Sequence, residues 1–448
     1  MSVTSSDFDL IVQKALAKAK QLGASDAAAS VSESSGLVVG VRQGQVETIE
    51  RMRDNSLGVT VYRGQARGSA STSDLSDKAL ADTVEAAWNI ARYTAEDEMA
   101  GLPAAEDLAT EADFKDLELY KPWDIDPTKA TELALQAEAA ALAYSDKITN
   151  SEGAQVDTGT GHFVMANSAG FMGGYQFSRH GISASVIAGQ GDGMQRDYWY
   201  TSNRYPERLE SAQRVGELAA KRSVMRLDAR QIPTGRYPVI FEAPLALGLI
   251  GHLTQAISGG ALYRKTSFLV DSLGTEVMSP HLSIYEDPFI LGGMGSSTFD
   301  NEGVRTSARD LLKDGVLQGY LLSTYSARKL AMQTTGNAGG SHNLVMRSSL
   351  TQADDDLNAL LKKMDRGLLV TELIGHGVNY VTGDYSRGAF GYWVENGEIQ
   401  HPVEEITIAG NLRDMFKQIL AIANDQITRG SKTGGSVLIE QMAVAGSK

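Results

Sequence analysis

Glycine is the residue that most restricts how this chain can fold, because its 448 residues include 46 Gly and only 10 Pro. Many of the glycines lie after residue 153, several of them in adjacent pairs such as Gly173-Gly174 and Gly339-Gly340. Glycine permits tight turns between strands and lets one backbone approach another closely. The composition therefore favours strands joined by short turns.

The first 95 residues combine two helical patterns with segments typical of strands. Residues 6–22 carry one apolar stripe at helical spacing, and Gly23 is a favourable stop. A second helix is expected from Ser76, its N-cap, to about Tyr93. Five short strands are predicted between these helices: Ala27–Ser32, Leu37–Arg42, Val46–Arg51, Gly58–Arg63 and Gln65–Ala70. Residues 1–95 are thus predicted to form a two-layer domain of helices and an antiparallel sheet.

The next part of the chain, residues 96–230, is predicted to be a linker and a second α+β domain. Residues 95–125 are acidic and irregular, which indicates a linker or a wrapped segment. Asp126-Pro127 begins a third helix, strands punctuated by glycine follow from 150 to 203, and a fourth helix is expected over 206–226. The order helix, strands, helix therefore occurs twice, which suggests a structural repeat.

The remaining residues, 231–448, mix glycine-rich strands and loops with helices expected near 245–258, 354–364 and 411–424. The predicted fold class is α+β. A two-layer N-terminal region of helices and antiparallel sheet is followed by a Gly-rich, mixed β/α C-terminal domain.

Charge and composition exclude several classes of protein. The net charge of -14 argues against nonspecific binding to a nucleic-acid backbone, which needs clustered Lys and Arg. The absence of Cys excludes disulfides, thiolate zinc sites and Cys nucleophiles. The first residues have no basic region followed by an apolar core, and no apolar run reaches about 18 residues. The chain is expected to be soluble and cytoplasmic, without a membrane span.

Several longer segments together carry a resemblance to one protein family. They are Ser69–Leu75, Gly259–Leu269, Tyr325–Leu330, Gly383–Ala389 and Trp393–Leu412. Over essentially its whole length the chain resembles the TldD/PmbA family of bacterial and archaeal proteins. In that family, the TldD-type subunit carries an H-E-x-x-x-H helix and a later Cys, which hold zinc. The second type of subunit lacks these residues and pairs with the first.

The resemblance implies that this chain carries no zinc site of its own. His252 occupies the first position of the motif, but Leu253 replaces the Glu and Ile257 replaces the second His. A catalytic zinc needs three protein ligands, so His252 alone cannot hold the ion. No catalytic residue and no metal or other cofactor are predicted here; zinc is expected in the TldD-type partner. His252 is expected to be a hydrogen-bonded residue on a packed helix.

Other motifs give no catalytic site. No two of the seven His are three or four residues apart, and no G-x-S-x-G elbow is present. His342 follows Gly339-Gly340-Ser341 and His376 lies between Gly375 and Gly377, and for each a surface-loop position is favoured over a peptide contact. Gly191-Asp192-Gly193 and Gly295-Ser296-Ser297 are interpreted as turns.

The segment from Asp384 to Arg387 is a dense polar cluster between glycines, and two interpretations of it stay open. Asp384 and Arg387 pair locally within a turn, or the segment borders a peptide-binding groove. The resemblance favours the groove, for which the candidate residues are His252, Asp384, Tyr385 and Arg387.

The expected function is that of a partner subunit, in a heterodimer with a TldD-type zinc subunit that cleaves unfolded or extended peptides. Two alternatives stay open. The chain is a metallopeptidase in its own right, with an atypical site built from distant residues, or it is a homodimeric peptide-binding or scaffold protein.

Overall fold

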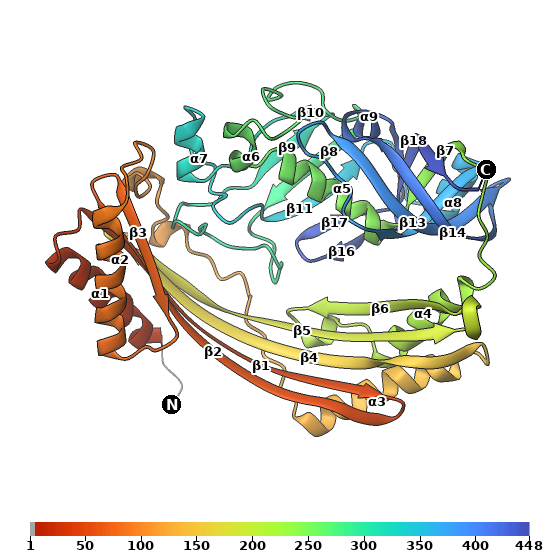
Figure 1. Cartoon of the computed structure of the whole chain (residues 1–448), viewed down its shortest axis with the longest axis horizontal. Helices are drawn as coiled ribbons and strands as arrows, with labels where there is room; N and C mark the ends of the chain where they lie inside the picture. Colours follow the sequence, from red (N-terminus) through yellow and green to blue (C-terminus); the bar gives the residue numbers. More distant parts are fainter. Residues whose placement is uncertain (1–4, 448) are drawn as a thin grey trace.

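Three six-stranded sheets form the framework of this computed structural model, which describes residues 5–447. The first sheet is antiparallel and is covered by helices, and the other two belong to the C-terminal part of the chain (Figure 1). The α+β fold class and its order along the chain are confirmed.

The N-terminal sheet is built from two matching halves. Each half has the order helix, three strands, helix, and the strands lie in the order β3-β2-β1-β4-β5-β6. The elements are α1 (Ser5–Gln21), β1 (Asp26–Arg42), β2 (Gln45–Arg63), β3 (Ala66–Thr72), α2 (Asp77–Tyr93), α3 (Pro127–Ala143), β4 (Ile148–Asn167), β5 (Met172–Ala188), β6 (Gln195–Asn203) and α4 (Ala212–Met225). The repeat predicted from the sequence is present, and its two halves join through antiparallel pairing of β1 with β4.

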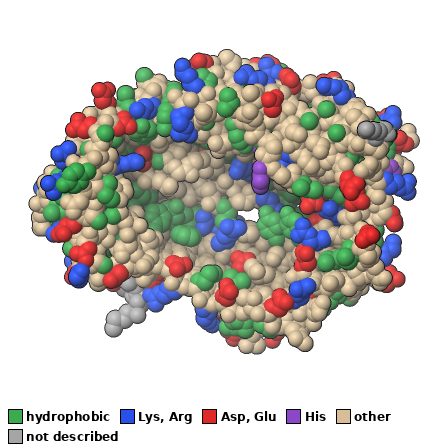
Figure 2. All heavy atoms as spheres, in the orientation of Figure 1, with side chains coloured by type: hydrophobic (Ala, Val, Ile, Leu, Met, Phe, Trp, Pro, Cys, Tyr) green, Lys and Arg blue, Asp and Glu red, His purple; other side chains and the backbone are tan. Residues whose placement is uncertain are grey.

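The helices pack in pairs at the two ends of this sheet. One apolar core lies under α1 and α2, and another lies under α3 and α4. The predicted caps are present, since the side chains of Ser76 and Asp126 accept hydrogen bonds from the first turns of α2 and α3. The sheet curves strongly, and the C-terminal domain lies over its concave side (Figure 1). The space-filling view shows a hollow between them, bordered by hydrophobic and basic side chains (Figure 2).

Three predictions from local pattern differ from the structure. The five predicted N-terminal strands are three, since four of them merge in pairs into the long strands β1 and β2. In β1 the polar segment Glu33–Ser35 pairs with β2 on one side and β4 on the other. Hydrogen bonding to a neighbouring strand on each side pairs the backbone N–H and C=O groups of this segment, whatever its side chains are. The helix expected over 411–424 is only α9 (Leu412–Lys417). The next residues form β15 (Ile419–Ile422), because they pair with a neighbouring strand, and tertiary pairing overrides local propensity. In addition, the fourth helix begins at Ala212, after a separate short turn over Pro206–Arg208.

The acidic segment between α2 and α3 is wrapped against the C-terminal domain. The Tyr325 hydroxyl donates to Asp97 at 2.6 Å, and the Arg328 guanidinium donates to the Leu102 carbonyl at 2.7 Å. The segment therefore fastens the two parts of the molecule to each other.

The C-terminal domain contains the other two sheets. Their strand orders are β10-β9-β8-β11-β17-β16 and β14-β13-β12-β7-β18-β15. Its elements, with α9 and β15, are β7 (Gly235–Phe241), α5 (Ala243–Ala256), α6 (Gly259–Tyr263), β8 (Leu282–Asp287), β9 (Arg309–Lys313), β10 (Val316–Leu317), α7 (Thr324–Lys329), β11 (Asn343–Ser348), α8 (Leu357–Met364), β12 (Gly367–Ile374), β13 (Asp384–Glu395), β14 (Glu398–Asn411), β16 (Ile427–Arg429), β17 (Lys432–Gly434) and β18 (Val437–Ala445). The apolar face of α5 belongs to one large core that includes strands from both sheets.

Charged side chains of α4 join the N-terminal sheet to the C-terminal domain. The Arg222 guanidinium donates to both oxygens of Glu242, at 2.8 and 3.1 Å, just before α5 begins. The Arg226 guanidinium lies 2.6 Å from Glu372 on β12. Asp197 on β6 lies 3.4 Å from both arginines. These contacts fix the position of α5 relative to the sheet.

Over residues 5–447, no helix is both long and apolar enough to cross a membrane.

Candidate functional site

Helix α5 and its C-cap carry the positions that align with the zinc motif. Its inward face is apolar, and Leu253 and Ile257 are both 0% exposed within the large C-terminal core. Side chains of this kind at these two positions build a core and offer no ligand to a metal ion.

His252 lies on the half-buried side of the same helix. Its Nδ1 atom is 2.8 Å from the Tyr380 hydroxyl, and its ring stands edge-on to that of Tyr385 with centroids 5.7 Å apart. Burial, assisted by the positive charge of Arg387, lowers the pKa of His252 to about 4. The imidazole is therefore neutral near pH 7. This agrees with a hydrogen-bonded residue on a packed helix.

Strand β13 presents two of the other candidate residues toward His252. Tyr385 and Arg387 are two residues apart and share one face, since side chains alternate along a strand. Asp384 is exposed, accepts from Thr382 at 2.6 Å and from Asn411 at 3.1 Å, and has no part in the cluster around His252. The structure thus brings together His252, Tyr385 and Arg387, and it places Asp384 elsewhere. Asp384 and Arg387 do not form the local pair that the sequence left open.

The guanidinium of Arg387 is incompletely satisfied. Its Nε atom is buried and has no hydrogen-bond partner among the described residues. Burial raises the pKa of the neighbouring Tyr385 to about 12, against the opposing effect of Arg387, so the phenol stays protonated. A buried donor without a partner costs about 1–3 kcal/mol.

The residues around His252 do not fit a zinc ion. One imidazole is available, the neighbouring helix positions are apolar, and the permanent charge of Arg387 would repel a divalent cation. Across the part of the chain that the structure describes, no group of three or more His, Cys, Asp or Glu side chains is placed to hold a metal.

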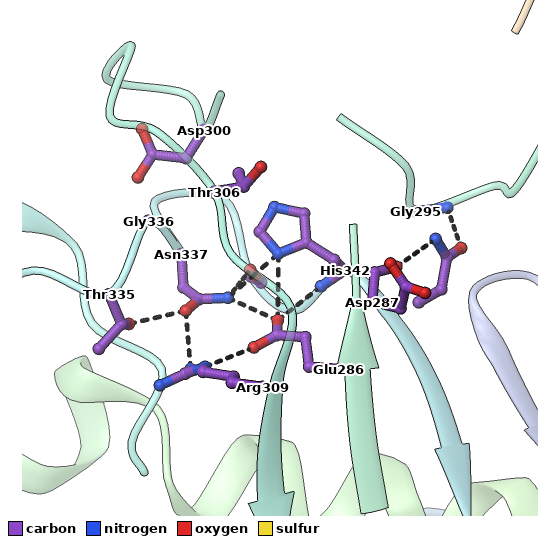
Figure 3. Close-up of polar contacts among 12 residues, drawn as sticks. Glu286, Asp287, Gly295, Asp300, Thr306, Arg309, Thr335, Gly336, Asn337 and His342 are labelled. Atoms are coloured by element: carbon purple, nitrogen blue, oxygen red, sulfur yellow. Dashed lines mark hydrogen bonds and ion pairs between the residues drawn. The ribbon is translucent and has the colours of Figure 1, made fainter. Parts of the chain in front are cut away.

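A second polar cluster surrounds Glu286 at the end of β8, and no sequence motif marks it (Figure 3). The carboxylate is 1% exposed. Its Oε1 atom accepts from the Asn337 amide at 2.7 Å, from the His342 backbone N–H at 2.9 Å and from His342 Nδ1 at 3.1 Å. Its Oε2 atom accepts from Arg309 Nε at 2.9 Å. Burial acts to raise the pKa of Glu286, but the hydrogen bonds from His342 and the charge of Arg309 outweigh it and lower that pKa to about 2.

The surface-loop prediction for His342 was therefore wrong, while His376 is exposed in a loop as predicted. His342 is 7% exposed, because the carboxylate of Glu286 draws both its ring and its backbone inward. No local signal announces this cluster, since Glu286 and His342 are 56 residues apart and meet only when β8 pairs with β11.

The Glu286 cluster predicts a stability that depends on pH. Because the pKa of Glu286 is lower in the folded chain, its contribution is complete above the ordinary value of 4.5 and is lost as the pH falls toward 2. That contribution is on the order of 3 kcal/mol. Glu286→Gln should lower the urea midpoint of unfolding at pH 7. As the pH falls from 4.5 to 3, the midpoint of this variant should decline less than that of the wild type. The matched control is Glu398→Gln, at an exposed position, which should follow the wild type. An unchanged acid decline in Glu286→Gln would contradict this assignment.

Comparisons with known proteins place the chain in a family. Models of the PmbA/TldA metallopeptidase family match in three consecutive parts: domain 1 at residues 27–91, the central domain at 120–227 and the C-terminal domain at 234–446. The chain is 49% identical to the metalloprotease PmbA homolog of Haemophilus influenzae, covering 97% of this chain and 95% of that protein. It is 47% identical to metalloprotease PmbA of Escherichia coli O157:H7, covering 97% and 96%.

Solved structures share the complete fold. A candidate modulator of DNA gyrase from Bacteroides thetaiotaomicron superposes with a TM-score of 0.93 at 27% identity, covering 100% of both chains. TldE from Thermococcus kodakarensis superposes with a TM-score of 0.85 at 18% identity, covering 97% of this chain and all of that one, and shows the fold alone. A metalloprotease TldD homolog of Haemophilus influenzae is 28% identical, covering 46% of this chain and 44% of that protein. The three family matches and the full-length identity establish that this chain belongs to the PmbA/TldD metallopeptidase family.

Proposed function

We propose that this chain is the non-catalytic subunit of a two-subunit peptidase. A TldD-type partner holds the zinc ion and cleaves the peptide bond, and this chain helps to hold an unfolded or extended peptide. Support comes from family membership and from α5, where apolar, fully buried side chains stand at the positions that a zinc motif requires.

The observation that carries the peptide-holding role is the half-buried Arg387, which forms no ion pair with a described carboxylate and lies beside the neutral His252. An extended peptide exposes a carbonyl at every residue, and a guanidinium donates to such oxygens through a fixed, planar group. Because the contact is to main-chain atoms, it depends little on the peptide's sequence. His252 and Tyr385 form the wall against which the guanidinium is held.

The partner surface is proposed to lie in residues 235–448, next to this cluster. Ile374 and Val381 flank the loop before β13 and are 57% and 54% exposed. Apolar side chains exposed this far at the edge of a polar cluster suit the centre of a protein interface. A stable heterodimer should bury more than about 1,000 Å² in total.

The purified chain is expected to hold no stoichiometric zinc and to cleave no peptide alone. Leu253 and Ile257 supply no ligand, and Arg387 opposes a cation near His252. Metal analysis by mass spectrometry and a peptidase assay with and without a chelator check both points. About one tightly held zinc per chain, or chelator-sensitive cleavage by the isolated protein, would instead favour a metallopeptidase in its own right.

Arg387→Ala tests the peptide-holding role in the assembled heterodimer. Loss of a charge-assisted hydrogen bond should weaken peptide turnover roughly tenfold, mainly through KM. Complex formation and the melting temperature should change little, because Arg387 forms no ion pair with a described carboxylate and its Nε has no partner. Asp384→Ala, on the opposite face of the same strand, is the matched control and should retain turnover. Unchanged turnover with a lowered melting temperature would show that Arg387 is only structural.

A further inference from the structure

A cavity of about 260 Å³ lies in the hollow between the curved sheet and the C-terminal domain. Its walls come from β4 and β5 on one side and from two C-terminal loops, residues 294–301 and 338–342, on the other. A second cavity of about 430 Å³ shares the loop residues Gly339, Gly340 and Ser341 and extends to Thr254 and Gln255 on α5. The loop thus borders a path from α5 toward the N-terminal sheet.

The Glu286 cluster holds this loop in place. Oε1 of Glu286 accepts hydrogen bonds from Asn337, just before the loop, and from His342, its last residue. Gly339 and Gly340 have φ angles of 102° and 116°, in the region that favours glycine, and a Cβ on Gly340 would meet open space. Another backbone can therefore lie close to the loop.

The same carboxylate fixes which nitrogen of His342 carries the hydrogen. An ionised Glu286 only accepts, so Nδ1, 3.1 Å from Oε1, carries a hydrogen. In the neutral form of the ring, Nε2 then keeps its lone pair as an acceptor. Figure 3 shows this second nitrogen pointing away from Glu286, and it makes no hydrogen bond with the residues that the structure describes. His342 lines the 260 Å³ cavity, where Nε2 is an oriented acceptor without a donor.

The rest of the cavity wall restricts what can occupy it. One side is aromatic, formed by Phe163, Tyr175 and Phe299, whose ring centroids are 4.5–6.1 Å apart. Among described residues, the lining includes neither Lys nor Arg, so it offers no cation to an anionic ligand. The volume is slightly below the roughly 300 Å³ at which small-molecule sites begin, and so suits one large side chain with its backbone.

We infer that His342, positioned by Glu286, accepts a backbone N–H of an extended peptide and that a large apolar side chain of this peptide packs against Phe163, Tyr175 and Phe299. This subsite rests on the proposed function, because it assumes that the chain holds peptide. It adds a preference for an apolar residue at one position, at a site separate from Arg387.

The test measures binding of a fluorescein-labelled, unfolded decapeptide of Gly and Ala with one central Phe to the isolated full-length chain, by fluorescence anisotropy. His342→Asn is the informative variant, because the Asn amide can replace Nδ1–H as donor to Glu286 while nothing replaces Nε2. Its Kd should rise roughly three- to tenfold with an unchanged melting temperature, as for loss of one hydrogen bond. Replacing Phe by Ala in the peptide should weaken wild-type binding about tenfold.

Peptides N-methylated at one position at a time test the same contact without altering the protein. Methylation at one position near the Phe should weaken binding to the wild type and should have no further effect on His342→Asn. The inference is overturned if no methylated position behaves in this way, if His342→Asn binds like the wild type, or if the Phe peptide and the Ala peptide bind equally. It is also overturned if the isolated chain binds no peptide; copurification with a TldD-type subunit would then still support the partner role.

Discussion

Leu253→Glu combined with Ile257→His is expected to unfold the chain rather than to create a zinc peptidase. Both side chains are 0% exposed in the largest apolar core. Burying a carboxyl group and an imidazole there costs several kcal/mol for each, which together approaches the whole stability of a typical domain, about 5–15 kcal/mol. A third ligand would still be missing, and Arg387 would still oppose a cation. Circular dichroism, the melting temperature and zinc content of the purified double variant provide the measurement.

The matched control is Leu253→Met with Ile257→Val, which keeps the core apolar and should cost about 1 kcal/mol for each replacement. A double Glu/His variant that stays folded and binds zinc would show that the surroundings of α5 still supply the rest of a zinc site. Cleavage of peptide by that variant would contradict the proposed division of labour between the two subunits.

Local signals in the sequence were enough to find most N-terminal elements and helix α5. Ser76 and Asp126 stand where the structure places the N-caps, and the glycine-punctuated region 150–203 forms strands. These features depend on side chain and backbone a few residues apart, which a sequence shows directly. The repeat was visible for the same reason, since each half has its own order of helices and strands.

The polar clusters could not be found in this way, because they depend on distant pairing. Glu286 meets His342 only through the ladder between β8 and β11, and the spacing of these residues resembles no motif. The position of Asp384 depends on strand alternation. As the first residue of β13, its side chain lies on the other face of the strand from those of Tyr385 and Arg387. A one-residue shift of that strand would have exchanged the two sets, and composition alone cannot fix such a register.

Arg222→Met is expected to lower the free energy of unfolding by about 3 kcal/mol, because it leaves Glu242 without its cation and Asp197 with Arg226 alone. The guanidinium donates to both oxygens of Glu242 and lies 3.4 Å from Asp197, whose side chain is nearly buried. Since Glu242 immediately precedes α5, the loss should also loosen the helix that carries His252. Urea unfolding at pH 7 gives the free energy of unfolding, and hydrogen exchange of the α5 amides reports the local effect.

Lys129→Met, from an exposed pair with Glu132, is the control and should cost at most about 0.5 kcal/mol. Arg222→Met with Glu242→Met should recover part of the loss, because it removes one of the stranded charges. Arg222→Met could instead prove no less stable than the Lys129 variant. That result would mean that water solvates the carboxylates in place of Arg222 and that the ionic contacts of α4 do not hold α5 against the sheet.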